Sequence, residues 1–275
     1  MALVVNTNIA SLTAQRNLGL SSSALSGSIA RLSSGLRITR AADDAAGLGI
    51  SETFRAQVRS INQAVRNAND GISLLQIADG AAGNIGNILG RLRELAEQSA
   101  SGILGNTERS FVDQEFIALR SEIDRIATVT EFNGVKLLSG SGNNALQIQI
   151  GFRSSINDAL TLSLNDLDRI TLGLTNVNVS TNVNAASALA NIDSAITTVA
   201  KARANIGSLQ NRLDASIQNL TVSSENVSAA ESRIRDADVA FETSKFVRNQ
   251  ILVQAGTSIL AQANQIPQQA LTLLR

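Results

Sequence analysis

The 275-residue chain has no histidine, cysteine, tryptophan or tyrosine, and its only aromatic residues are seven phenylalanines. It therefore lacks a thiolate nucleophile, an imidazole base and the usual Cys and His ligands of a zinc site. A site built from carboxylates or lysine alone is the enzymatic alternative that remains. We expect no enzyme activity, no cofactor and no bound metal. The missing cysteines also exclude a disulfide framework.

Surplus charge and long apolar runs are absent as well. Lys plus Arg and Asp plus Glu both number 23, so the net charge is zero. Phosphate binding needs a basic surplus, so we expect no nucleic-acid partner, whereas near-zero charge favours self-association. No run of about 18 apolar residues is present, and we expect no membrane insertion. The opening MALVVNTNIA lacks a basic region before an apolar stretch, so we expect no cleaved signal peptide.

Long helical periodicity is the main positive signal of the sequence. From Phe54 to Leu75 apolar residues alternate at spacings of four and three, which is typical of a coiled-coil seam. The pattern predicts one helix over about 45–99 and another over about 107–129. The helical period returns near residue 184 and persists almost to the end. Patterns of this length indicate a coiled coil or an assembly.

The middle of the chain has a different period. Leucine and isoleucine alternate with polar residues over 146–150 and again over 160–164, which predicts a β-hairpin with one buried face. The predicted fold is therefore mainly α: a long antiparallel helical coiled-coil rod with a small β-hairpin segment in the middle of the chain. Since residues 141–182 interrupt the helices and lie farthest from both termini, we expect them to form the tip.

Both ends of the chain are almost uncharged. Arg16 is the only charged residue among residues 1–30, and Arg275 the only one among residues 249–275. Solvent-exposed helices usually carry many charges, so these ends are either flexible polar tails or segments that become ordered on assembly. Apolar residues at heptad spacing favour assembly. The predicted assembly seam comprises Ile9, Leu12, Leu18, Leu25, Leu32, Leu252, Ile259 and Ile266.

Blocks of distinctive sequence lie towards the two ends. They are LSSGLRITRAADDAAGLGISE (32–52), NDGISLLQIADG (69–80), RELAEQ (93–98), EFNGVKLL (131–138), ENVSAAESRIRDAD (225–238) and LAQANQIPQQALTLLR (260–275). In this order they resemble the terminal signatures of bacterial flagellins. The resemblance implies a subunit that polymerises with itself into the extracellular flagellar filament, after export as an unfolded chain through the flagellum's own channel. A flagellar hook–filament junction protein and an intracellular helical binding module are the alternatives.

The resemblance also implies a domain organisation. Residues 1–41 with 237–275 would form an inner terminal domain that lines the channel. Residues 42–140 with 183–236 would form a helical rod domain, and residues 141–182 its β-hairpin tip. Many flagellins insert large outer domains after the β region, and this chain resembles a short form without them.

The resemblance further implies a connector between the inner and outer domains, where a glycine and several charged residues separate the first two helices. The glycine can end one helix in a left-handed conformation, and aspartates can cap the next. Arginines are expected to pair with these aspartates or with those after residue 235, whereas a solvated linker is the alternative. The connector set is Gly35, Arg37, Arg40, Asp43, Asp44, Asp236 and Asp238.

Further partners follow from the resemblance alone. Related flagellins contact the flagellin-sensing Toll-like receptor at positions matching Arg91, Leu95 and Glu115, although packing between subunits is the alternative role. Helical spacing predicts that Leu95 faces the core and the other two are exposed. An export chaperone, a filament cap and hook-junction proteins are also expected. The predicted chaperone contacts are Leu271, Leu273 and Leu274.

Overall fold

The computed structural model describes residues 7–140, 145–153 and 155–273, without the side chains of residues 156 and 266–273. Five helices and two small antiparallel sheets make up the described chain, so the prediction of a mainly α fold is confirmed. The chain divides into two compact units, Met1–Ala56 with Asn226–Arg275 and Gln57–Glu225. Both divisions fall inside long helices, α2 and α4. The predicted three-domain organisation stays a prediction.

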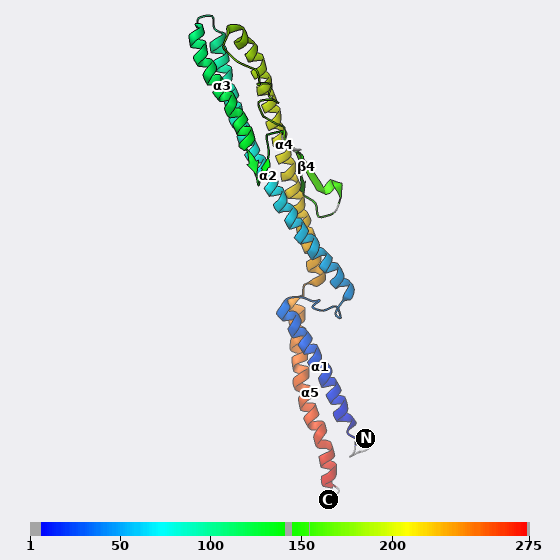
Figure 1. Ribbon diagram of the computed structural model, residues 1–275. Helices are drawn as coiled ribbons and strands as arrows, with labels where there is room; N and C mark the ends of the chain where they lie inside the picture. The colour runs from blue at the N-terminus through cyan, green and yellow to red at the C-terminus, as the bar shows by residue number, and fades with distance from the viewer. Residues whose placement is uncertain (1–6, 141–144, 154, 274–275) are drawn as a thin grey trace. The chain divides into compact units, whose positions relative to one another are not determined.

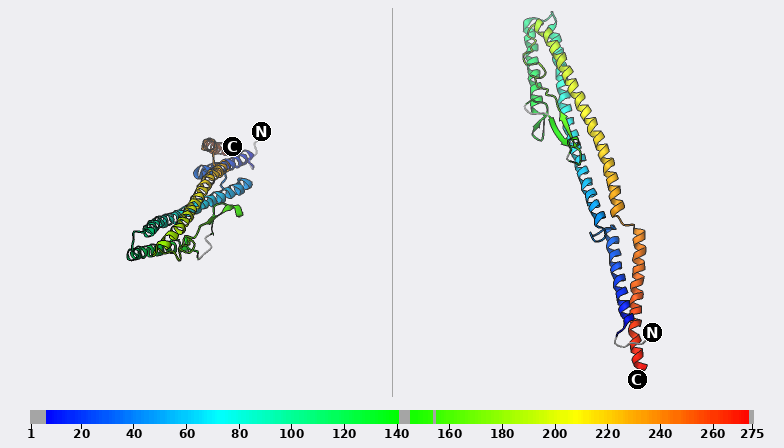
Figure 2. Two further views of the ribbon diagram at one scale, coloured as in Figure 1. Left: turned by 90° about the horizontal axis from the view of Figure 1, so that it is seen from above. Right: turned by 90° about the vertical axis from the view of Figure 1, so that its right-hand side faces the viewer.

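The first unit contains an antiparallel helix pair. α1 (Ile9–Ser34) and α5 (Val239–Leu273) lie side by side in all views (Figures 1 and 2). Asn8 caps α1 by accepting a hydrogen bond from the Ser11 amide at 3.0 Å, and its Nδ2 donates to the Ala263 carbonyl at 2.7 Å. Asn8 thus both starts one helix and attaches it to the other.

The second unit is built on long helices. Most of α2 (Ala45–Ala100), all of α3 (Asn106–Val129) and most of α4 (Asn182–Arg235) pack around a core of leucine, isoleucine and alanine. The predicted apolar seams are the faces they bury, and Phe116 is fully enclosed. The two predicted helix ranges are confirmed to within one residue at either end. Ion pairs Arg93–Asp193 and Arg203–Asp79, both at 2.8 Å, join α2 to α4.

The end of α2 is closed by a buried arginine. Arg109 donates from Nε to the Ser99 carbonyl at 2.9 Å and from Nη2 to the Ser101 carbonyl at 2.8 Å. The last carbonyl groups of a helix have no hydrogen-bond donor within the helix, and here the guanidinium provides the donors. Arg109 therefore fixes the turn into α3.

The predicted β-hairpin is present in the middle of the chain. Its strands pair Leu146 with Leu162 and Ile148 with Leu160, and these side chains share the inner face. A Cβ on Gly71 of α2 would lie 2.5 Å from Ile148 Cδ1, so glycine makes room for the hairpin. The strands and the short 3₁₀ helix are β1 (Glu131–Phe132), β2 (Val135–Lys136), β3 (Ala145–Gln149), η1 (Ile156–Asp158) and β4 (Ala159–Ser163).

The helical period that returns near residue 184 is divided between two helices. α4 ends at Arg235 and α5 begins at Val239. Asp236 pairs with Leu36 in an isolated β-bridge, and the Ala237 amide donates to the Gly35 carbonyl at 2.9 Å. These backbone bonds replace the helical ones, so the helix can stop there without leaving buried groups unpaired.

Candidate assembly site

The α1 side of the helix pair follows a strict heptad pattern. Along one face of α1, buried and half-buried residues follow one another at spacings of three and four, as in a coiled coil. The predicted Leu18, Leu25 and Leu32 are half-buried in this row, and their role in assembly stays a prediction. Small side chains fill the other positions. The full row is Ser11, Ala14, Leu18, Ser21, Leu25, Ser28 and Leu32.

The α5 side differs from the prediction by one residue. Leu252 and Ile259, which belong to the predicted seam, are 47% and 57% exposed. The helix restarts at Val239, and a close approach at Gly256, where a Cβ would lie 3.2 Å from Leu18 Cδ1, fixes which face turns inward. The observed row is Glu242, Phe246, Asn249, Val253, Gly256, Leu260 and Ala263. The Ile266 side chain lies outside the described residues.

The helix pair also carries exposed apolar side chains. On α1, Ile9 is 68% exposed, Leu12 52% and Leu20 65%, and on α5 they are joined by Leu252 and Ile259. Arg16 is the only charged residue that α1 carries before Arg31. Large apolar side chains left in water without intervening charges usually mark an interaction surface. Four predicted assembly residues, Ile9, Leu12, Leu252 and Ile259, therefore lie outside the pair's own seam, and three lie within it.

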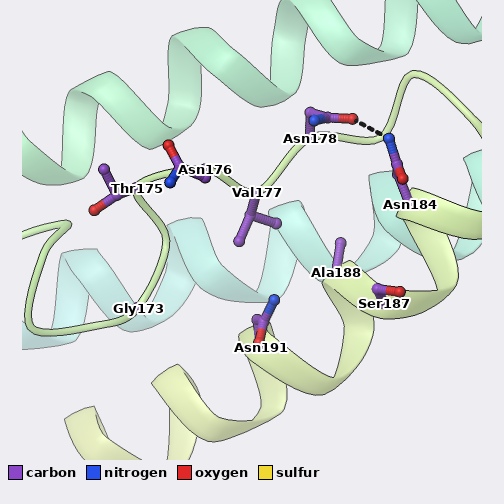
Figure 3. A pocket seen from close by; sticks show the side chains of 9 residues that line it. All are labelled: Gly173, Thr175, Asn176, Val177, Asn178, Asn184, Ser187, Ala188 and Asn191. Atoms are coloured by element: carbon purple, nitrogen blue, oxygen red, sulfur yellow. Dashed lines mark hydrogen bonds between the residues drawn. The ribbon is translucent and has the colours of Figure 1, made fainter.

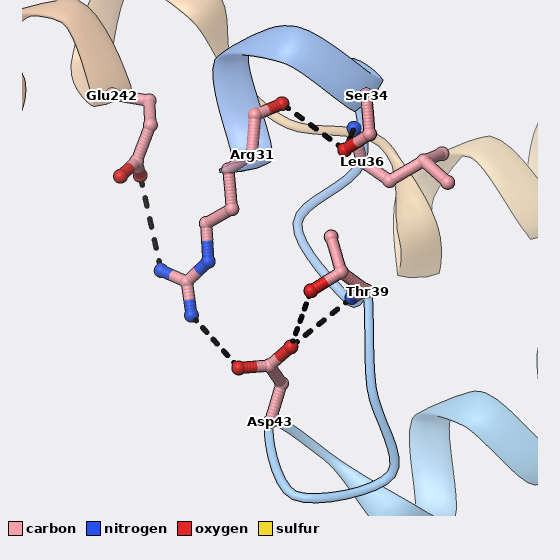
Figure 4. Close-up of polar contacts among 6 residues, drawn as sticks. All are labelled: Arg31, Ser34, Leu36, Thr39, Asp43 and Glu242. Carbon is pink, nitrogen blue, oxygen red and sulfur yellow. Dashed lines mark hydrogen bonds and ion pairs between the residues drawn. The ribbon is translucent and has the colours of Figure 1, made fainter. Parts of the chain in front are cut away.

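Asp43 organises the connector between α1 and α2 (Figure 4). Its Oδ2 accepts hydrogen bonds from the Thr39 hydroxyl at 3.0 Å and from the Thr39 and Arg40 amides at 3.1 Å each. These bonds, that of the hydroxyl foremost, lower the pKa of Asp43 from 3.8 to about 2. Arg31 of α1 lies 3.4 Å from Asp43 and 3.9 Å from the buried Glu242 of α5. The connector loop is thereby attached to both helices of the pair.

The predicted arginine pairs are not the ones that form. The Arg37 guanidinium donates to the Ile234 carbonyl, and its amide donates to the Arg235 carbonyl at 2.7 Å. Neither Arg37 nor Arg40 forms an ion pair within the described part of the chain. Arg235 takes that role with Glu52 at 2.7 Å, and its hydrogen bond lowers the pKa of Glu52. The seam position of Glu242, next to Arg31 on the facing helix, was a signal that sequence reasoning missed.

The glycine and aspartate caps occur as predicted, with one exception. Gly35 ends α1 in the left-handed region at φ 70°, and Asp44 caps α2 by accepting from the Gly47 amide at 2.8 Å. Asp43 holds the loop and does not cap the helix. A Cβ on Gly47 would lie 2.3 Å from Asp44 Oδ2 and 2.8 Å from Cδ1 of the fully buried Ile38. Glycine is therefore required where the connector meets α2.

The predicted receptor-contact residues lie together on the second unit. Arg91 and Glu115 form an ion pair at 3.0 Å between α2 and α3, and their side chains are 48% and 47% exposed. Leu95 is 1% exposed and faces the core, as the spacing predicts. The ion pair is thus an exposed link between the helices, while Leu95 can act only through the backbone it positions.

A pocket of about 340 Å³ lies between α4 and the loop before it (Figure 3). Asn178 Oδ1 accepts a hydrogen bond from Asn184 Nδ2 at 2.9 Å across its rim. Its lining carries no titratable side chain, so it offers no group for acid–base chemistry. Within residues 7–140, 145–153 and 155–273, no cluster of three potential metal-binding side chains occurs and no helix could span a membrane. The lining residues are Gly173, Thr175, Asn176, Val177, Asn178, Asn184, Ser187, Ala188 and Asn191.

Comparison with known proteins identifies similar chains over almost the full length. The family model for the bacterial flagellin N-terminal helical region matches residues 5–143, and that for the C-terminal helical region matches residues 189–274. A flagellin of Halalkalibacterium halodurans is 44% identical over 273 residues, covering 99% of this chain and 100% of the relative. The flagellar filament 33 kDa core protein of Treponema phagedenis is 40% identical over 286 residues, with the same coverage.

A solved structure agrees with these relatives. The crystal structure of Bacillus cereus flagellin is 36% identical, with a TM-score of 0.51 over 60% of this chain and 94% of that one. The two family models match both ends of the chain in the order that the sequence blocks predict. The chain belongs to the bacterial flagellin family.

Proposed function

We propose that this flagellin polymerises into the flagellar filament through the α1–α5 pair. As a flagellin it is a structural subunit, and a filament requires the same contacts to repeat from copy to copy. The single observation that carries the proposal is the exposed, uncharged apolar surface of that pair, which includes Ile9, Leu12, Leu252 and Ile259. Other copies of the chain are the partners that would cover it.

The energetics support this assignment. Each Å² of apolar surface removed from water contributes about 25 cal/mol, so a few leucine and isoleucine side chains per copy supply several kcal/mol. Charges on these faces would oppose burial, and the faces carry almost none. A head-to-tail contact that does not close on itself gives a helical polymer, whereas a closing one gives a ring.

The connector supports a second part of the proposal, the transmission of load between the predicted inner domain and the predicted rod domain. Asp43, Arg31 and Glu242 tie the loop to α1 and α5, and Arg235 with Glu52 ties α4 to α2. These contacts hold together the two places where the chain passes between the predicted domains, the α1–α2 loop and the α4–α5 junction. The connector set Gly35, Arg37, Arg40, Asp43, Asp44, Asp236 and Asp238 is accordingly proposed as an interdomain brace.

Electron microscopy of purified full-length protein tests the proposal. Fibres should form above a critical concentration, and a fragment of residues 57–225, which lacks the α1–α5 pair, should not form them. Fibres from the fragment would refute the role of the terminal helices.

Further partners and properties are proposed on the family resemblance. They are an export chaperone on Leu271, Leu273 and Leu274, a filament cap, hook-junction proteins, and a host Toll-like receptor at Arg91, Leu95 and Glu115. Export through the flagellum's own channel and a structural role without enzyme activity belong to the same proposal. The described side chains favour the receptor site in one respect, since Arg91 and Glu115 are accessible.

A further inference from the structure

We infer that Asn133 is a site of spontaneous deamidation, a covalent modification that converts it to aspartate or isoaspartate. Asn133-Gly134 is the one Asn-Gly sequence of the chain. It forms the two-residue turn between β1 and β2, and both residues are exposed. The inference rests on this turn alone and does not depend on the proposed function.

The reaction needs no partner except water. The Gly134 amide nitrogen attacks Asn133 Cγ and forms a five-membered succinimide, while the Cγ–Nδ2 bond breaks and ammonia leaves with the proton of the attacking amide. Water then opens the ring. Addition at the Cγ carbonyl gives aspartate, and addition at the main-chain carbonyl gives isoaspartate, in which the backbone runs through the side chain.

The geometry leaves both reacting groups available. Within the described chain, the Gly134 amide and the Asn133 side chain have no hydrogen-bond partner. Glycine has no Cβ, so nothing shields its amide nitrogen. Asn133 is held at φ 49°, the only non-glycine residue with positive φ among those described, and Gly134 at φ 79°. Such a pair is typical of a type I′ hairpin turn.

The surrounding structure permits the rotation that the attack requires. The nitrogen reaches Cγ only if the Asn133 backbone leaves its left-handed conformation, and that conformation is itself unfavourable for a residue with a Cβ. The ladder of the hairpin consists of two residue pairs, Glu131–Lys136 and Phe132–Val135. A two-stranded ribbon this short opens readily.

The product would change the turn but not the core. A new carboxylate at position 133 would add negative charge two residues from Glu131, which forms an ion pair with Lys136. The following Leu137 and Leu138 are buried, and the Leu137 amide donates to the Thr130 carbonyl at 3.1 Å below the turn. That anchor should survive the modification.

Mass spectrometry of aged protein tests the inference, with an internal control. Folded full-length protein is incubated at neutral and at alkaline pH, digested, and labelled with isoaspartyl methyltransferase. Asn176 is the control because it is also exposed and outside regular structure, but is followed by the β-branched Val177. Modification at Asn133 should exceed that at Asn176 by about tenfold, because a branched side chain hinders the attacking nitrogen.

Two further results decide the matter. Loss of the amide proton generates the nucleophile, so the rate should rise with pH. The Asn133→Gln variant, whose longer side chain would have to close a six-membered ring, should lose most of the label. Equal modification at Asn133 and Asn176, or an unchanged total in Asn133→Gln, would overturn the inference.

Discussion

Ile259 and Leu260 are neighbours on α5 with opposite surroundings, and the proposed assembly depends on that difference. Ile259 is 57% exposed, whereas Leu260 is half-buried against α1. Complete burial of an isoleucine side chain contributes about 1.5–3 kcal/mol, so covering its exposed part in a polymer contributes roughly 1–1.5 kcal/mol. Ile259→Ala should remove most of this contribution to the free energy of assembly. Because 1.4 kcal/mol corresponds to a factor of ten, the critical concentration should rise about tenfold.

A charge at the same position should have a larger effect. Ile259→Asp loses the same burial and also places an unpaired carboxylate between subunits, so we expect a total above about 3 kcal/mol. The critical concentration should then rise more than about a hundredfold. Sedimentation of protein over a range of concentrations gives this quantity directly. The monomer should stay folded, as measured by thermal unfolding of the second unit.

The matched control lies on the opposite flank of α5. Gln254 is exposed and polar, so Gln254→Ala removes no apolar burial and should leave the critical concentration unchanged. Assembly of Ile259→Asp at the wild-type concentration would show that this face of α5 stays in water in the filament, and the reasoning from exposed apolar surface would fail.

Lowering the pH from about 3.8 to about 2 should destabilise the connector, because the folded pKa of Asp43 is depressed and the stability that its carboxylate contributes is lost on protonation. The difference in thermal midpoint between wild type and Asp43→Asn should therefore disappear over that range, and a constant difference would contradict this prediction. Gly47→Ala should lower stability by about 1–3 kcal/mol through overpacking, measured by denaturant unfolding, whereas Gly49→Ala, with nothing within 4 Å, should be neutral or stabilising. A fragment of residues 42–236 should elute as a folded monomer in size-exclusion chromatography, and oligomers would argue against assembly by the termini. Arg91→Ala should weaken activation in a Toll-like receptor reporter assay, and equal activity would remove Arg91 from the receptor site.

The sequence was sufficient to predict the long helices and the hairpin. From Phe54 to Ile72 one row of large apolar residues repeats without a competitor, so the buried face follows from spacing alone. The hairpin has the same property, since Ile148 and Leu160 alternate with polar neighbours and pair as expected. In both cases a shift of one residue would have placed polar side chains in the core.

Spacing alone could not determine the packing of α5. Leu252 and Ile259 repeat at seven residues, and so do Val253 and Leu260. Both rows are apolar, so the pattern allows either face to turn inward. The choice depends on Gly256, which lets Leu18 approach, and that contact joins residues far apart in the chain. The connector ion pairs were missed for a related reason, because a long arginine side chain reaches several carboxylates and only the fold selects one.

The composition of the α1–α5 pair argues that its stability comes mainly from outside the pair. Its own seam places Ser11, Ser21 and Ser28 where a stable coiled coil would have leucine or isoleucine, so each of these positions buries little apolar surface. Larger apolar side chains such as Ile9 and Leu20 face outward instead. Ordering the helices costs about 1–2 kcal/mol per residue in backbone entropy, which so weak a seam offsets poorly. The arrangement therefore favours helices that become ordered as neighbouring copies cover their outer faces. It disfavours a helix pair that is already fully stable in the isolated subunit.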